Sequence, residues 1–471
     1  MRIKLILPAL EEATSPYFRP IKYSLFPPLG LMTLAAYAAE EDEVVVCDEH
    51  VEEVDTDDEP DIVAIETYVT SAYRAYELAD LYRGRGVHVC LGGLHATSLP
   101  DEAALHADTV FVGPGEDTWP AFLADSRVGR PQTRYVSVRR TLEGAPRPRR
   151  DVVDLRRYLV PNALTVSRGC PYSCDFCYKD SFFAGGRSFY TMKVEQALAE
   201  IDALPGRHLY FLDDNLLADE RFARNLFAGM RGAGRVWQAA GTVESVLRPG
   251  LIEAAAAAGL RSLFVGFETL DEGALAEQGK CHNLGRDYDE AVRRLHAAGV
   301  MVNASFVFGM DHHGPDVFDR TVEWAISRGV ETSTFHLLTP YPGTRLHARM
   351  AAEGRITTND WSLYDTRHAV ISHPRMSAGQ LEAGYDRARR DFYRWGSIAR
   401  GALARETPAE SIRHAAYQIG WKKLGPMWDA AIRVKRLADA RPWLERVLGR
   451  TTATAGAAGP APCPSIGAER A

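Results

Sequence analysis

The sequence predicts an α/β protein that contains two parallel sheets in succession and ends in a helical region. Short runs of β-branched residues alternate with helical stretches over residues 1–125, and the alternation resumes on a longer period from residue 163. Residues 376–450 show helical patterns without further strand runs and are rich in Arg and Trp. Alternation of this kind is typical of parallel sheets whose crossover connections are helices.

Five short apolar runs predict the strands of the N-terminal sheet. Helical stretches such as 29–41 and 71–84 separate them. Crossovers of this length predict a doubly wound, Rossmann-like domain over residues 1–125, which would bind ligands at the carboxyl ends of its strands. Residues 126–158 are rich in Arg and Pro, and we expect them to form a linker. The predicted strands are RIKLIL (2–7), EVVVC (43–47), DIVAI (61–65), VHVCL (87–91) and DTVFV (108–112).

Six further βα units predict a partial (β/α)6 barrel over residues 159–355, with its chemistry at the carboxyl ends of the strands. A helical region over 356–450 is expected to follow. The Ala/Gly/Pro-rich tail, 451–471, is expected to be disordered, and its Cys463 has no predicted role. The predicted strands are ALTVSRG (163–169), HLYFLDD (208–214), VWQAAGT (236–242), SLFVGFET (262–269), VMVNASFVFG (300–309) and TSTFHLLTP (332–340).

The composition of the chain narrows the classes of function. A length of 471 residues is enough for two or three domains, and the net charge of −7 gives no reason to expect nucleic acid as a partner. No apolar run reaches the ~18 residues of a membrane span. The short N-terminal apolar run breaks at Pro8, so we expect a first strand there rather than a signal peptide. The seven cysteines are odd in number and unevenly spread, which favours a reducing compartment and a cytoplasmic enzyme.

The segment SRGCPYSCDFCY (167–178) places three cysteines in the spacing C-x3-C-x2-C, directly after the first predicted barrel strand. Short loop spacings let successive thiolates converge on one metal centre. Iron–sulfur cubanes normally take four thiolates, so three would leave one iron open to another ligand. A structural zinc site completed by a His is an alternative, although such sites usually show paired cysteines and a close fourth ligand. A buried trio of small apolar thiols is a second alternative.

This segment resembles the signature of radical S-adenosylmethionine (SAM) enzymes. The resemblance implies that Cys170, Cys174 and Cys177 hold a 4Fe–4S cluster and that Phe176 lies beside the adenine of SAM. In that family the open iron binds the amino and carboxylate groups of SAM. Electron transfer then yields a 5′-deoxyadenosyl radical, which abstracts hydrogen from an unactivated carbon. An external electron donor such as flavodoxin or ferredoxin is implied as a partner.

Two later segments extend the resemblance across the barrel. YFLDDN (210–215) occupies the place of the family's Gly-Gly-Glu stretch, so Asp214, and less clearly Asp213, are candidates for contact with SAM. A helix N-cap is the alternative role for both aspartates. FVGFET (264–269) resembles the family's Gly-x-Glu segment, which makes Glu268 a candidate for a ribose or methionine contact. A carboxylate at the end of an apolar strand is also difficult to explain as a solvated charge.

The N-terminal domain resembles the cobalamin-binding domain that precedes the barrel in one large radical SAM subgroup. The resemblance lies in LGGLHATSLPDEA (91–103) and VGPGEDTWPAFL (112–123). Glycines in these sheet loops would let a bulky nucleotide tail lie against the backbone, although ordinary tight turns are the alternative. The candidate cobalamin-binding glycines are Gly92, Gly93, Gly113 and Gly115.

His50 lies in a segment similar to the Asp-x-His-x-x-Gly motif that supplies a lower cobalt ligand in other corrinoid proteins. Two features argue against that role. Glu53 stands where Gly is expected, and the segment follows the second strand instead of the first. We therefore predict that cobalamin is bound without a protein histidine on cobalt and that His50 is a surface loop residue.

The subgroup implies that cobalamin methylates an unactivated carbon of a small molecule or a lipid. Radical cyclisation or oxidation without methyl transfer, with or without cobalamin, is the alternative, and no catalytic residue is assigned. The sequence does not select the substrate. Trp421, Trp428 and Trp443 lie among basic residues, so this region either caps the barrel or rests on a membrane surface. Candidate substrate contacts, each of which could equally be a satisfied core polar group, are Gln238, Asn303, Ser305 and His336.

Overall fold

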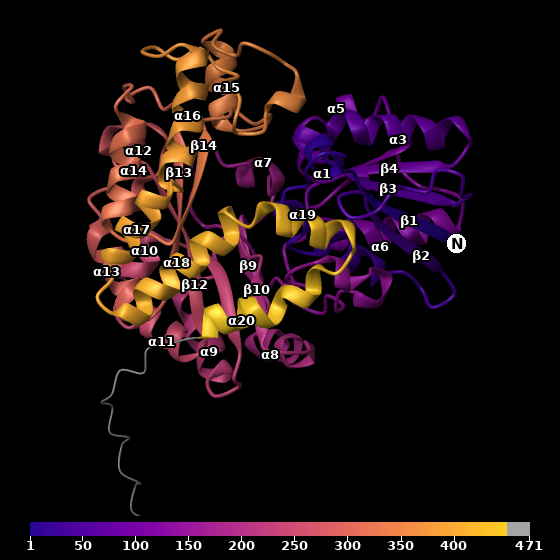
Figure 1. The fold of residues 1–471 in the computed structure, drawn as a ribbon. Helices are drawn as coiled ribbons and strands as arrows, with labels where there is room; N and C mark the ends of the chain where they lie inside the picture. The colour runs from indigo at the N-terminus through magenta and orange to yellow at the C-terminus, as the bar shows by residue number, and fades with distance from the viewer. Residues whose placement is uncertain (450–471) are drawn as a thin grey trace, which may run out of the picture.

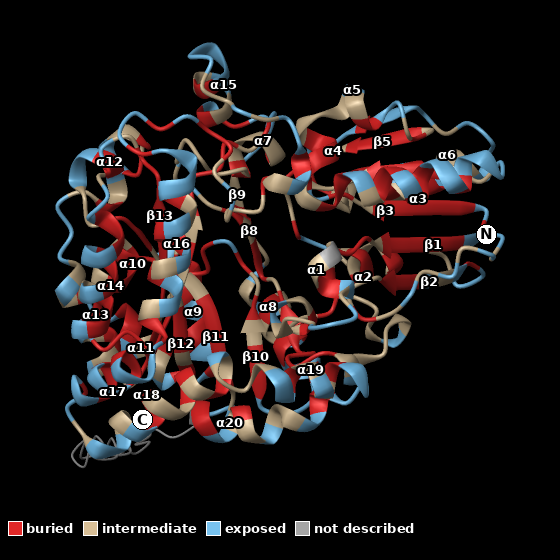
Figure 2. Ribbon diagram, turned by 45° about the horizontal axis from the view of Figure 1, so that its top comes forward, coloured by how far each residue is buried: buried red, intermediate tan, exposed pale blue. Residues whose placement is uncertain are grey.

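The computed structural model describes residues 1–449. Two α/β domains lie side by side, and C-terminal helices run along the base of the second (Figure 1). The strands of both sheets are largely buried (Figure 2). The predicted tail, 451–471, and Cys463 lie outside the described residues.

The N-terminal sheet has six parallel strands in the order β2-β1-β3-β4-β5-β6. The order reverses at β1, and crossovers such as α3 (Ala72–Gly84) and α6 (Gly115–Arg127) pack against the sheet. All five predicted strands are present, and β6 is an additional strand inside the predicted linker. The first part of 126–158 therefore belongs to the sheet. The strands are β1 (Arg2–Leu7), β2 (Glu43–Asp48), β3 (Ile62–Glu66), β4 (His88–Gly92), β5 (Thr109–Val112) and β6 (Arg134–Val136).

The second sheet also has six parallel strands, in the order β14-β13-β12-β11-β10-β7. Its edge strands β7 and β14 are not paired with each other, so the barrel is partial, as predicted. Leu209, Leu263 and Phe306 contribute to one large core between this sheet and its helices. The strands are β7 (Ala163–Leu164), β10 (His208–Phe211), β11 (Val236–Thr242), β12 (Leu260–Glu268), β13 (Met301–Phe308) and β14 (Thr332–Leu337). The outer helices include α8 (Val194–Ala203), α9 (Glu220–Met230), α11 (Leu251–Ala257), α13 (Tyr288–Ala297) and α14 (Val317–Ser327).

The predicted first barrel strand, 163–169, is divided in the structure. Its first part is β7, and its second part is β8 (Ser167–Gly169), which leaves the barrel sheet and pairs antiparallel with β9 (Phe189–Thr191). Gly169 has a φ of +75°, and a Cβ there would lie 2.0 Å from the Ser188 carbonyl oxygen. Only glycine fits this close approach, so the residue before the first cysteine is fixed by packing.

The C-terminal helices close the base of the barrel, as the cap interpretation predicts. Trp428 is 2% exposed and packs with Val236 and Met301 of the barrel strands, and Trp421 and Trp443 pack against the same cluster. The three tryptophans thus contact protein, Trp428 as a buried side chain and Trp421 and Trp443 as partly buried ones. Over residues 1–449, no helix combines the length and apolar character that crossing a membrane requires. Helix α16 (Ala378–Phe392) instead packs along β14 and α14, and its buried side chains belong to the main barrel core. The helices that follow it are α17 (Trp395–Leu403), α18 (Pro408–Lys422), α19 (Gly425–Arg433) and α20 (Arg441–Gly449).

Candidate active site between the two domains

The three motif cysteines lie on one loop between β8 and α7 (Lys179–Phe182). Cys170, Cys174 and Cys177 are free thiols and partly buried. Backbone hydrogen bonds hold the loop at both ends: the Cys170 N–H donates to the carbonyl of Ser188, which precedes β9, at 2.9 Å, and the Cys177 N–H donates to the Cys174 carbonyl at 3.1 Å. By their number and chemistry, three free thiols on one loop are a donor set that fits an iron–sulfur cluster with one open iron.

The surroundings of the thiols also fit a cluster. The Asn215 side-chain amide donates to the Cys170 sulfur at 3.6 Å, and its own Oδ1 is buried without a partner. Burial raises the pKa of Cys174 to about 11 and that of Cys177 to about 12. Because metal ligation takes thiolates, loading this loop with iron must release protons.

Asp213 and Asp214 hold the cysteine loop by different contacts. The Asp213 carboxylate, 3% exposed, accepts hydrogen bonds from the Val166 N–H at 3.1 Å and from the N–H and hydroxyl of Ser167 at 2.5 Å each. Burial raises the pKa of Asp213 to about 7. This carboxylate therefore fixes the start of β8 and is not a helix N-cap.

The Asp214 carboxylate contacts both ends of the loop. It accepts from the Gly169 N–H at 2.9 Å, before the first cysteine, and from the Tyr178 hydroxyl at 2.6 Å, after the last. The N-cap of the following helix α9 is Asp219, so the N-cap alternative is wrong for Asp214 as well. A contact between Asp214 and SAM stays a prediction.

Glu268 ends β12 in a strained conformation. Its φ is +66°, and the pairing register with β13 shifts between Gly266 and Glu268. The carboxylate, 8% exposed, forms an ion pair with the ammonium group of Lys280. Burial lowers the pKa of Lys280, but Glu268 and the Cys174 thiol more than offset this effect, so the pKa is raised. A positively charged Lys280 beside the cysteine loop suits a cofactor that carries a carboxylate.

A cleft with about 1330 Å³ of empty space opens between the two domains. Phe176 and Glu268, both predicted SAM contacts, line it, together with Cys177 from the cysteine loop. Its walls are mostly apolar. The N-terminal domain contributes Tyr68, Val69, Thr70, Leu94 and Ser98. The barrel contributes Tyr178, Phe264, Ser305, Val307, His336, Leu337, Leu338, Thr339, Tyr341, Pro342 and Thr366.

A second cavity, of about 780 Å³, lies at the carboxyl ends of the N-terminal strands. All four predicted glycines, Gly92, Gly93, Gly113 and Gly115, line it. Gly93 has a φ of +100°, and a Cβ there would meet the Thr67 backbone at 3.0 Å. A side chain at this position would be strained, and the bare backbone leaves room for a bulky ligand. The cavity therefore fits the nucleotide tail of cobalamin.

The cavity also reaches the cysteine loop. Arg168, on β8, lines the cavity and forms an ion pair at 2.7 Å with Glu116 at the start of α6. The carboxylate of Glu66, at the end of β3, lines the same space, and burial raises its pKa. The strand that leads into the cysteine loop is thus tied to the N-terminal domain.

His50 follows β2, as predicted, and does not line the cavity. Its side chain is 10% exposed, so the expectation of a surface residue is wrong. Nδ1 lies 2.8 Å from Asp48, and the ring stacks on Tyr23 at a centroid distance of 5.5 Å. Among the described residues that line the cavity there is no histidine. The absence of a histidine ligand on cobalt stays a prediction.

Of the four candidate substrate contacts, Ser305 and His336 line the cleft. Gln238 instead belongs to a buried network, in which its side-chain amide lies 3.0 Å from His208 and its oxygen accepts from the Tyr417 hydroxyl at 3.4 Å. Asn303 is not among the residues that line the cleft. Sequence reasoning missed Lys280, Arg168 and Thr366. Lys280 and Thr366 lie outside the quoted motifs, and Arg168 lies inside the cysteine segment without a predicted role.

Comparison with known proteins divides the chain into the same two domains. Residues 23–123 match the B12 binding domain family, and residues 164–339 match the Radical SAM superfamily. The bacteriochlorophyllide d C-12(1)-methyltransferase of Chlorobaculum tepidum is 27% identical, over 79% of this chain and 83% of that protein. The hopanoid C-2 methylase of Rhodopseudomonas palustris is 27% identical, over 72% of this chain and 66% of that protein. The structure of the cobalamin-dependent S-adenosylmethionine radical enzyme OxsB has a TM-score of 0.67 at 15% identity, over 90% of this chain and 72% of that one.

A partial barrel with a three-cysteine loop defines a radical SAM enzyme, and the preceding domain defines its subgroup. The chain belongs to the cobalamin-binding radical SAM family. Its cofactors are a 4Fe–4S cluster, SAM and cobalamin.

Proposed function

We propose that the protein methylates an unactivated carbon of a large, mainly apolar substrate held in the interdomain cleft. One observation carries this proposal. A single cleft is lined by the cysteine loop on one side and by Tyr68, Val69 and Thr70 of the cobalamin-binding domain on the other. A substrate in this space faces both cofactor domains, and such positioning can supply several kcal/mol of a reaction barrier.

When bound, the cluster and SAM supply a 5′-deoxyadenosyl radical, and cobalamin supplies a methyl group. The chain's own part is to hold these groups and exclude water. Cys170, Cys174 and Cys177 would bind the cluster. Phe176 would pack against the adenine of SAM, and Glu268 with Lys280 would bind the polar groups of SAM. The backbone around Gly92, Gly93, Gly113 and Gly115 would bind the cobalamin tail.

Few polar side chains line the cleft around His336. His336 Nδ1 lies 3.1 Å from the Thr366 hydroxyl, and burial lowers the pKa of His336, which keeps the imidazole neutral. Thr366 has a φ of +63°, and strain of this kind is concentrated at functional sites. A fixed neutral imidazole and the Ser305 hydroxyl would orient one polar group of an otherwise apolar substrate. The two curated relatives, named for a macrocyclic pigment and a polycyclic lipid, support this substrate class.

The test is a label-transfer assay. The reconstituted protein is incubated under reducing conditions with cobalamin, trideuteriomethyl-labelled SAM and either bacteriochlorophyllide d or a hopanoid. We expect 5′-deoxyadenosine and a substrate that carries the labelled methyl group, both detected by mass spectrometry. Cys177→Ala should yield neither product. Unlabelled, oxidised or cyclised substrate would instead favour radical chemistry without methyl transfer.

A further inference from the structure

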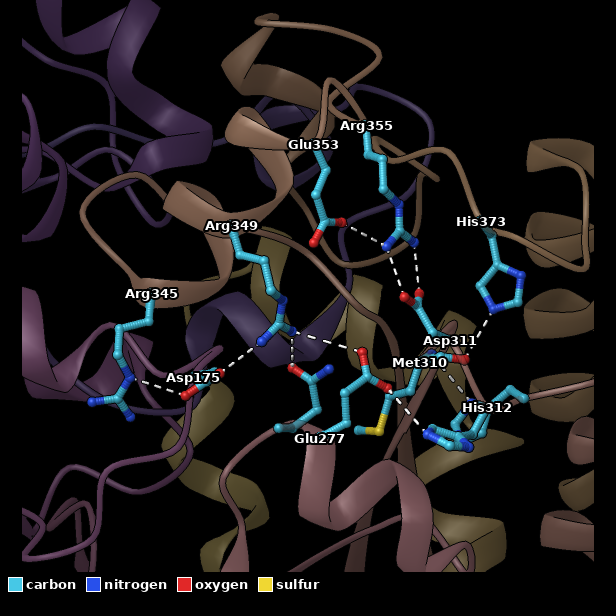
Figure 3. Close-up of polar contacts among 12 residues, drawn as sticks. Asp175, Glu277, Met310, Asp311, His312, Arg345, Arg349, Glu353, Arg355 and His373 are labelled. Carbon is cyan, nitrogen blue, oxygen red and sulfur yellow. Dashed lines mark hydrogen bonds and ion pairs between the residues drawn. The ribbon is translucent and has the colours of Figure 1, made fainter.

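The peptide between the second and third cluster cysteines is held by a helix that forms much later in the chain. Helix α15 (Arg345–Ala352) follows the last barrel strand, β14. The Asp175 carboxylate accepts from Arg345 Nε at 2.9 Å and from Arg349 Nη1 at 2.8 Å, and both arginine side chains point toward it (Figure 3). We call these three residues the loop clamp.

Backbone contacts hold the same peptide. The Asp175 N–H donates to the Gln278 carbonyl at 3.0 Å, and the Leu346 N–H donates to the Asp175 carbonyl at 3.0 Å. The Arg345 guanidinium also donates to the Ser173 carbonyl. Both neighbours of Cys174 are therefore fixed. The backbone contacts do not depend on the Asp175 carboxylate, so a change of charge there can leave the loop folded.

The clamp brings several charges close to the cysteine loop. Arg345 forms a second ion pair with Asp180 at 3.2 Å, and Arg349 one with Glu277 at 3.8 Å. The three side chains of the loop clamp differ in how far they are exposed to solvent. The Asp175 side chain is 17% exposed, Arg349 30% and Arg345 52%. Water screens an exposed charge more strongly, so we expect Asp175 to act most on the cluster and Arg345 least.

We propose that the loop clamp tunes the reduction potential of the cluster and that Asp175 and Arg349 are positioning residues for its binding loop. The inference rests on the family's cluster and not on methyl transfer. A cluster gains one negative charge when an external one-electron carrier reduces it. A nearby guanidinium stabilises that reduced state, whereas a nearby carboxylate destabilises it. The two kinds of charge therefore act on the potential in opposite directions.

The experiment is a redox titration of the reconstituted cluster, followed by EPR, in the full chain. Asp175→Asn removes the negative charge and should raise the midpoint potential. Arg349→Gln removes a positive charge and should lower it. Both variants should retain the iron content of the parent protein, because the backbone contacts of Asp175 remain.

A matched control lies just beyond α15. Arg355 forms a two-bond ion pair with Asp311, at 2.6 and 2.7 Å, and its other contacts are Glu353 and the Ser372 carbonyl rather than the cysteine loop (Figure 3). Arg355→Gln should leave the potential unchanged.

Shifts of the same sign in Asp175→Asn and Arg349→Gln, or no shift in either, would overturn the proposal. If Arg349→Gln loses iron, the midpoint potential of Arg349→Lys, which keeps the positive charge, is measured instead. A potential equal to that of the parent protein supports the proposal, and a lowered potential overturns it. None of these readouts requires substrate, so they stand apart from the test of methyl transfer.

Discussion

Neighbouring acidic residues of this site have separate roles that follow from their partners. Asp213 accepts three hydrogen bonds at the start of β8, and Asp214 joins the two ends of the cysteine loop. Glu268 reaches the same cleft from β12 and meets a lysine twelve positions later in the chain. These contacts show which carboxylates build the loop and which one faces the cleft.

Substitution of Glu268 tests the role of its ion pair with Lys280. Glu268→Gln leaves the buried Lys280 ammonium without its counter-charge, so we expect a loss of about 3 kcal/mol in the free energy of unfolding. We also expect weaker SAM binding, measured by the change that SAM causes in the EPR spectrum of the reduced cluster.

The double variant Glu268→Gln, Lys280→Met separates the two effects. It removes the unpaired charge and should recover most of the stability, but it should not recover SAM binding. If the double variant binds SAM as the parent does, the pair serves only the fold.

The cysteines, Glu268 and the four cavity glycines could be predicted because each stands in a short motif. Lys280 and Arg168 could not. Their partners, Glu268 and Glu116, lie 12 and 52 positions away in the chain, and a Lys or Arg is usually a solvated surface charge even when, like Arg168, it stands next to a motif. Only the fold shows that Arg168 lines the N-terminal cavity and that Lys280 is paired with Glu268 at the cleft.

At the scale of the secondary-structure elements, strands β3, β4 and β5 end at the N-terminal cavity, where glycines leave room for a ligand. Gly92 has ordinary backbone geometry, and a Cβ there would meet only the Phe111 side chain, whose nearest atom, Cβ, would lie at 3.4 Å. Gly92→Val should therefore fold and fill part of the cavity. We expect less cobalt per chain after reconstitution with cobalamin, with the iron content unchanged.

Gly84→Ala is the control for this change, because a Cβ at Gly84, on α3, has nothing within 4 Å. It should bind cobalt as the parent does. Full cobalt binding by Gly92→Val would show that the cofactor does not use this cavity.

Apart from 163–169, the predicted strands of both sheets are confirmed, because continuous apolar runs specify buried parallel strands. Strand β6 was missed because RYV is short and sits among polar and Arg-rich residues. The division of 163–169 into β7 and β8 was also missed. It depends on the approach of Gly169 to Ser188, a tertiary contact that no local pattern carries.

At the scale of the whole molecule, one buried charge cluster joins the barrel to the C-terminal helices. Glu331, 1% exposed, accepts from the Val302 N–H at 2.8 Å and lies 3.2 Å from His296. Arg405, in the turn between α17 and α18, and His414, on α18, lie 3.8 and 3.9 Å from it. This carboxylate is therefore a contact shared by two parts of the molecule.

Burial acts to raise the pKa of Glu331, but His296, His414 and Arg405 more than offset it and hold the pKa well below its usual value. A carboxyl whose pKa is depressed by folding stabilises the folded state at neutral pH, and that stability is lost as the pH falls below the ordinary carboxyl range. Glu331→Gln should lower the free energy of unfolding at pH 7 by about 3 kcal/mol. Urea unfolding at several pH values should also show a smaller loss on acidification than in the parent. An equal loss in both proteins would contradict this role.

The central claim is that one chain holds a radical-generating cluster and a cobalamin on either side of a shared cleft. Metal analysis after anaerobic purification, with iron, sulfide and cobalamin supplied, tests it most directly. The structure and the family predict about four iron atoms and about one cobalt atom per chain. Iron without cobalt would contradict the claim, because the N-terminal domain would then be a scaffold and the methyl source would be absent from the cleft.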